Sequence, residues 1–142
     1  MNVDNLIIKN DLEHINWEEL SELFLAVGWK NHKVDRIFKA FENSQIVAIG
    51  YIDNKIVGCG RVLTDHEFYA AIYDVAIHPN FQGKGIGKVI VSNLLKHLND
   101  ISFVHLTATT GNEEFYRNLG LKNHKTAMGR YLSLSLEEEY LD

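Results

Sequence analysis

The stretch that decides the fold runs from residue 74 to residue 88 and reads Asp74-Val75-Ala76-Ile77-His78-Pro79-Asn80-Phe81-Gln82-Gly83-Lys84-Gly85-Ile86-Gly87-Lys88. An apolar strand leads into a glycine-rich turn, and the turn opens a helix. The first N–H groups of a helix have no partner inside the helix and lie at the positive end of its dipole. Because Gly83, Gly85 and Gly87 have no Cβ, phosphate oxygens can approach these amides closely. The sequence therefore predicts an anion site at this turn.

Two common nucleotide-binding patterns do not fit the turn. A P-loop needs Gly-x4-Gly-Lys-Ser/Thr, but Val89 follows Gly87-Lys88 and Gln82 stands at the position of the first glycine. The dinucleotide fingerprint needs Gly-x-Gly-x-x-Gly, and here the spacing is Gly-x-Gly-x-Gly. A third pattern, Gln/Arg-x-x-Gly-x-Gly/Ala, fits at Gln82, Gly85 and Gly87.

The rest of the chain predicts a mixed α/β (α+β) layer in which helices cover a sheet. Asn16 and Gly28 are suited to begin and end a first helix, and Asp53-Asn54 indicates a hairpin turn between two strands. Expected strands are 6–9, 46–51, 55–63, 68–78, 103–107 and 130–134. Expected helices are 17–27, a second one with its apolar face from Val34 to Phe41, 86–98 and 112–119.

Composition indicates one globular domain over residues 1–142. Apolar residues make up 46% of the chain and charged residues 23%. With 14 Lys and Arg against 19 Asp and Glu, the net charge of −5 argues against a nucleic-acid backbone binder. One cysteine, Cys59, excludes an internal disulfide, and the scattered histidines give no metal-ligand spacing. We expect no metal, no signal peptide, no membrane span and a cytoplasmic location.

The glycine segment resembles the pyrophosphate-binding motif of the GNAT superfamily of N-acetyltransferases. The strand Ile72 to His78 resembles the central strand of that family, which directly precedes its cofactor loop. The segment from Asn112 to Leu121 resembles the late Phe-Tyr-x-x-x-Gly-Phe segment of the family, with Leu121 in place of the usual aromatic residue. The order of elements also matches from about Leu6 to Leu134. The resemblance implies a mostly antiparallel, twisted central sheet that is flanked by helices and splays after the central strand.

The same resemblance implies how acetyl-CoA is held. Backbone groups of Val75 and Ile77 would pair with the pantetheine arm, and an N–H near Val75 or Ala76 would stabilise the oxyanion of the thioester. Amides from Gly83 to Lys88 would hold the pyrophosphate. The expected cofactor-binding residues are Val75, Ala76, Ile77, Gln82, Gly83, Lys84, Gly85, Ile86, Gly87, Lys88, Asn112, Phe115 and Tyr116.

Tyr116 matches the usual general acid of the family, which protonates the departing thiolate; a role in packing or in orienting the sulfur is the alternative. An amine with a pKa of ~10 must lose a proton before it attacks, so a base is also needed. Asp74 is the first candidate, because a charge in so apolar a strand is costly unless it is paired or used. An Asp bonded to a neighbouring strand is the alternative. Asp65, His66 and Glu67 on the preceding turn are second candidates.

The expected function is acetyl transfer from acetyl-CoA to the primary amine of a small molecule, by direct attack in a ternary complex. One rival is a non-catalytic acyl-CoA sensor, and another is an acetyltransferase that acts on a protein or peptide. The loop from Gly28 to Lys33, with Trp29, is expected near the acceptor. Family members are often dimers, and the expected strand at 130–134 could pair across an edge to form a homodimer.

Overall fold

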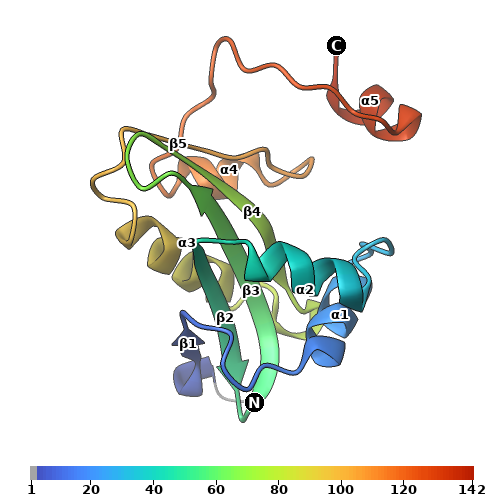
Figure 1. Ribbon diagram of the computed structural model, residues 1–142, viewed down its shortest axis with the longest axis vertical. Helices are drawn as coiled ribbons and strands as arrows, with labels where there is room; N and C mark the ends of the chain where they lie inside the picture. The colour runs from blue at the N-terminus through green and yellow to red at the C-terminus, as the bar shows by residue number, and fades with distance from the viewer. Residues whose placement is uncertain (1–2) are drawn as a thin grey trace.

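We describe a computed structural model of the chain, in which residues 3–142 are placed (Figure 1). The elements follow the chain in the order η1 (Val3–Asn5), β1 (Ile7–Lys9), α1 (Trp17–Ala26), α2 (Val34–Glu42), β2 (Ile46–Ile52), β3 (Lys55–Thr64), β4 (Tyr69–Ile77), η2 (Pro79–Phe81), α3 (Ile86–Lys96), β5 (Phe103–His105), α4 (Glu113–Arg117) and α5 (Leu134–Tyr140).

The sheet has the strand order β1-β2-β3-β4-β5, and its first four strands are antiparallel to their neighbours. The last pair, β4 and β5, is parallel and very short, since it joins only residues 69–71 to residues 103–105. Among the described residues, the rest of β4, from Ile72 to Ile77, has no strand on that side. The sheet therefore splays after its central strand, and this confirms the expected mostly antiparallel, splayed architecture.

Helices cover both faces of the sheet. In Figure 1, α3 lies on one face and α1 with α2 on the other. The core on the α3 side contains Ile86, Ile90 and Leu94 of the helix packed on the sheet. The opposite core joins Leu20 and Phe24 of α1 and Ile37 and Phe41 of α2 to the other face of the strands. The sheet that contains β4 is therefore packed on both faces.

Local signals explain several element ends. The Asn16 side chain accepts a hydrogen bond from the N–H of Glu19 and caps α1, as predicted. Asp53 and Asn54 both have positive φ angles, of 50° and 63°, and form the predicted tight hairpin turn between β2 and β3. Among the described residues, no helix is long and apolar enough to cross a membrane.

The predicted strand at 130–134 is wrong. Residues 130–133 form no regular structure, and Leu134–Tyr140 forms helix α5. Ser133 caps that helix by accepting a hydrogen bond from the N–H of Leu136, and Glu137 in the first turn suits the helix dipole. A strand at this position would need a partner edge, whereas these local helix signals need none.

Candidate active site

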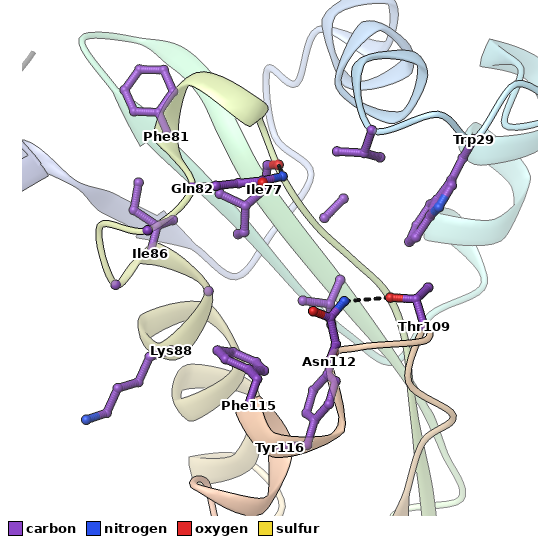
Figure 2. A pocket seen from close by; sticks show the side chains of 16 residues that line it. Trp29, Ile77, Phe81, Gln82, Ile86, Lys88, Thr109, Asn112, Phe115 and Tyr116 are labelled. Atoms are coloured by element: carbon purple, nitrogen blue, oxygen red, sulfur yellow. Dashed lines mark hydrogen bonds between the residues drawn. The ribbon is translucent and has the colours of Figure 1, made fainter.

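A cleft of about 670 Å³ opens beside the part of β4 that does not pair with β5. Residues 75–77 of β4 form one wall, and the glycine loop with the start of α3 forms the next. Residues of α4 close a third side, and Trp29, in the loop after α1, lies across from the glycine loop (Figure 2). Val27 also lines the cleft. The cleft thus gathers three segments that lie far apart in the sequence.

The glycine loop has the shape of a phosphate cradle. Gly83 and Gly85 have φ angles of 77° and 84°, which side chains rarely adopt. A Cβ at either position would meet no atom within 4 Å, so the space before these residues is open. Gly85 is also the N-cap of α3, which leaves the first amides of the helix facing this space. The residues present therefore fit a diphosphate group.

The side chains of Gln82 and Lys84, next to the glycines, contact other parts of the chain. The Gln82 side chain donates a hydrogen bond of 3.0 Å to the carbonyl of Ile77, so it ties the loop to the end of β4. The Lys84 ammonium lies 5.7 Å from the centroid of the Phe81 ring. Lys84 does not line the cleft, and it is the one expected cofactor-binding residue that lies outside the lining. A charge on the outer side of the loop can still act on an anion at longer range.

The short helix α4 brings aromatic and amide side chains to the cleft. The Phe115 and Tyr116 rings meet edge to face, with 4.9 Å between their centroids. Asn112 donates a hydrogen bond of 2.6 Å to the Thr109 hydroxyl, drawn as a dashed line in Figure 2. Burial raises the pKa of the Tyr116 hydroxyl, so this group keeps its proton at neutral pH. Among the described residues its hydroxyl has no hydrogen bond, which leaves it available to a bound molecule.

Asp74 is the extra residue of a β-bulge. Cys59 pairs with Ala76 and Arg61 with Tyr73, so Gly60 faces both Asp74 and Val75, and Asp74 has a φ of 56°. One carboxylate oxygen lies 2.9 Å from Nε2 of His32, and the other lies 2.6 Å from Nε of Arg61. The bulge therefore aims a carboxylate at two partners immediately before the wall of the cleft.

The charge of Asp74 is well compensated. Burial alone would raise the pKa of this carboxyl, but the hydrogen bonds from His32 and Arg61 and the charge of Arg61 outweigh it, and the pKa lies below its ordinary value. Both carboxylate oxygens have hydrogen-bond partners. The contacts of Asp74 therefore fit the alternative interpretation from the sequence, an Asp that is bonded to neighbouring elements. Asp74 does not itself line the cleft.

The second candidates for a base lie elsewhere. Asp65 accepts hydrogen bonds from the N–H groups of Glu67, Phe68 and Tyr69 and closes the turn before β4. Neither Asp65 nor its neighbours His66 and Glu67 line the cleft. Cys59 is fully buried, and burial raises the pKa of its thiol, which fits an unreactive core residue. Among residues 3–142, no group of His, Cys, Asp or Glu is arranged to hold a metal ion.

The structure brings the other expected cofactor residues together around this one cleft. The lining also contains Phe81 and Thr109, and neither position has a local sequence signal. The partners of Asp74 were missed as well: His32 lies in the loop after α1, and Arg61 lies on β3. Long-range pairing alone brings these residues to the bulge, so a pattern along the chain could not reveal them.

Comparisons with known proteins identify the family of the chain. The profile of the family described as "Acetyltransferase (GNAT) family" matches residues 10–121. An uncharacterised N-acetyltransferase, ycf52, from Pyropia yezoensis is 38% identical over 76% of this chain and 66% of its own length. The histone acetyltransferase TAP1 of Glycine max is 34% identical over 73% of this chain and 51% of its own. The chain thus spans half to two thirds of these relatives.

A solved structure has the same fold. An acetyltransferase of the GNAT family from Streptococcus pneumoniae superposes with a TM-score of 0.78 at 23% identity, covering 91% of this chain and 98% of the other. At this identity the match establishes the fold alone.

Proposed function

Because the chain belongs to the acetyltransferase (GNAT) family, we propose that it is a single N-acetyltransferase domain that moves an acetyl group from acetyl-CoA to a primary amine. The family uses acetyl-CoA as its co-substrate, and the cleft between β4 and α4 is the proposed site. The observation that supports this most directly is the glycine loop, whose open positions and free amides suit a diphosphate.

Each group of residues along the cleft has its own proposed role. The amides from Gly83 to Lys88 bind the diphosphate at one end. The backbone of Val75 and Ile77, which among the described residues has no strand on the β5 side, pairs with the extended arm of the cofactor as a further strand would. An N–H near Val75 or Ala76 donates to the thioester oxygen, where negative charge develops during attack. Asn112 and Phe115 line the other side of the arm.

Tyr116 is the proposed general acid. Its hydroxyl keeps its proton at neutral pH and lies in the cleft lining, so it is suited to protonate the thiolate that leaves. A CoA thiolate and a phenol have comparable basicity, both near a pKa of ~10, so the transfer needs little driving force. Asp74 takes part in handling the proton of the amine, at the bulge directly before Val75.

We propose a small molecule as the acceptor. Val27 and Trp29 close the cleft opposite the glycine loop, which leaves a bounded space beside the expected thioester. The rival acceptor is a protein, and the relative from Glycine max named as a histone acetyltransferase is the specific observation in its favour. A sensor that binds acyl-CoA without turnover is the second rival.

A panel of amines tests these proposals. Thiol release from acetyl-CoA is measured with polyamines, amino sugars, amino acids, aryl amines and histone-tail peptides. Turnover with a small amine supports the proposal, and turnover with peptides alone supports the protein acceptor. Binding of acetyl-CoA with no turnover on any amine supports the sensor.

We further propose that the protein forms a homodimer through its late segment, defined as residues 128–136. Met128 is 97% exposed and Leu132 is 92% exposed, and the segment lies away from the sheet in Figure 1. Exposed apolar residues that gather in one segment, here with Leu134 and Leu136 as well, are typical of a protein–protein interaction site. Sedimentation should give a dimer, and Leu132→Asp should give a monomer. A monomeric wild type would contradict this.

The cytoplasmic location stays a prediction, to be tested by fractionation.

A further inference from the structure

The proposed transfer needs a group that accepts a proton from the amine, and the cleft lining does not supply one. Its ionisable members are Lys88 and Tyr116. Lys88 lies on α3 beside the glycine loop, at the diphosphate end. Tyr116 holds its proton, because burial raises its pKa. The acceptor of the proton must therefore come from just behind the lining, near Val75 and Trp29, at the end opposite the phosphates.

Two acid–base groups, Asp74 and His32, lie behind that wall and are hydrogen-bonded to each other. Asp74 directly precedes Val75, and its oxygen Oδ1 lies 2.9 Å from Nε2 of His32. Its other oxygen is taken by Nε of Arg61 at 2.6 Å. A carboxylate with both oxygens bonded to donors is a poor proton acceptor. Asp74 is therefore suited to position a base through a hydrogen bond, and His32 is the residue that it positions.

The His32 ring lies against the lining of the cleft. Its centroid is 5.3 Å from that of Trp29, which lines the cleft, and 4.8 Å from that of buried Phe24. The side chain is 33% exposed, so it is not sealed in the core. When Nε2 donates to Asp74, the neutral ring presents a lone pair at Nδ1. Among residues 3–142, Nδ1 has no hydrogen bond.

We propose that His32 is the general base of the reaction and accepts the proton of the amine at Nδ1, while Asp74 is a positioning residue that fixes the ring and its tautomer. This inference rests on the proposed acetyl transfer. It assigns a catalytic role to one residue of the loop from Gly28 to Lys33, which is expected from the sequence to lie near the acceptor.

Arg61 completes the arrangement. Its guanidinium carbon lies 5.9 Å from the Phe41 ring centroid and 5.4 Å from that of Tyr73, so the group is held between two rings. Its NH1 also reaches the Ser44 hydroxyl at 3.4 Å. With this cation fixed on one oxygen, Asp74 stays ionised and keeps its other oxygen directed at His32.

The proton balance of the step is complete. The ammonium gives one proton to His32, and the neutral nitrogen forms the new N–C bond while the C–S bond breaks. The thiolate takes a proton from Tyr116, and the second proton of the nitrogen restores the Tyr116 hydroxyl. The products are the N-acetylated amine, the free thiol of CoA and one proton, which His32 releases to water.

Two variants test the base directly. His32→Gln keeps a donor for Asp74 but has no basic nitrogen, and His97→Gln is the matched control, because His97 is exposed at the end of α3 and does not line the cleft. With the best amine of the panel, His32→Gln should lower kcat about 10²-fold or more, with acetyl-CoA affinity by calorimetry unchanged. The control should keep full rate. Imidazole in the buffer should restore turnover to His32→Ala, which a merely structural role would not allow.

A spectroscopic measurement tests the pair without any substrate. Nitrogen chemical shifts of the His32 ring in the free protein should show the neutral form protonated at Nε2, and Asp74→Asn should abolish that preference. A neutral ring protonated at Nδ1, or full turnover by His32→Gln, overturns the proposal alone. Absence of turnover by the wild type on every amine, with acetyl-CoA bound, overturns the proposed function and the base together, so the two failures can be told apart.

Discussion

A Cβ atom on Gly87 would lie 3.3 Å from Cζ of Phe115, so the first turn of α3 and helix α4 meet with almost no space between them. The Phe115 ring packs in turn against the ring of Tyr116. The diphosphate cradle and the proposed general acid are thus parts of one packed unit. Their separation is set by this contact.

The first prediction concerns that contact. Gly87→Val should push Phe115 away and displace Tyr116, so kcat should fall about 10-fold or more, because small misplacements of catalytic groups are costly. Ser92→Val is the control, since it adds the same side chain at an exposed position of the same helix. Steady-state kinetics on both variants checks this. Equal rates for the two variants would mean that Gly87 does not position Tyr116.

The second prediction concerns the glycine loop. Gly85→Glu should abolish CoA binding, because its carboxylate would occupy the space of the phosphates and repel them. Gly120→Glu is matched for backbone strain, since Gly120 has a φ of 95° and likewise has no atom within 4 Å of a Cβ. Calorimetry should find binding in the control and none in Gly85→Glu. Retained affinity in Gly85→Glu would place the diphosphate elsewhere.

The third prediction concerns the acid. Tyr116→Phe should lower kcat about 10²-fold with little change in the affinity for acetyl-CoA, the usual scale for one proton donor. Tyr69→Phe removes a hydroxyl from an exposed residue at the start of β4 and should act at the wild-type rate. A Tyr116→Phe enzyme with full kcat would remove this hydroxyl from the mechanism.

The fourth prediction concerns stability and pH. The pKa of Asp74 lies below its ordinary value of 3.8, so its contribution to the free energy of unfolding is present above that value and is lost as the pH falls through the folded pKa. Asp74→Asn should cost about 1–3 kcal/mol at neutral pH, since it leaves Arg61 without its ion pair.

The decrease of the free energy of unfolding at acid pH separates this effect from others. Asp74→Asn should lose less stability than the wild type between neutral pH and the acid range, measured by urea unfolding at each pH. Glu138→Gln, at an exposed position of α5, should follow the wild type. Parallel curves for Asp74→Asn and the wild type would show that the carboxyl is not held by His32 and Arg61.

Sequence reasoning predicted most of the residues that line the cleft because they belong to two short segments of the chain. Gly83, Gly85 and Gly87 lie within five residues, and the strand, the turn and the helix that present them are continuous in the chain. Phe115 and Tyr116 followed from a second short segment. Backbone chemistry that depends on neighbours in sequence is visible in the sequence.

The contacts of Asp74 are formed by tertiary structure, so they could not be predicted in the same way. The bulge at Asp74 exists only through the register of β3 against β4, and it joins His32 and Arg61, which lie 42 and 13 residues away along the chain. The strand expected at 130–134 was wrong for a related reason, since a strand forms only where a neighbouring edge accepts its backbone hydrogen bonds.

The most direct test of the central claim is the crystal structure of the complex with CoA. The account predicts the diphosphate on the amides from Gly83 to Lys88, the arm beside Val75 and Ile77, and the sulfur within hydrogen-bond reach of the Tyr116 hydroxyl. Density for CoA at another surface, with the glycine loop free of phosphate, would contradict it.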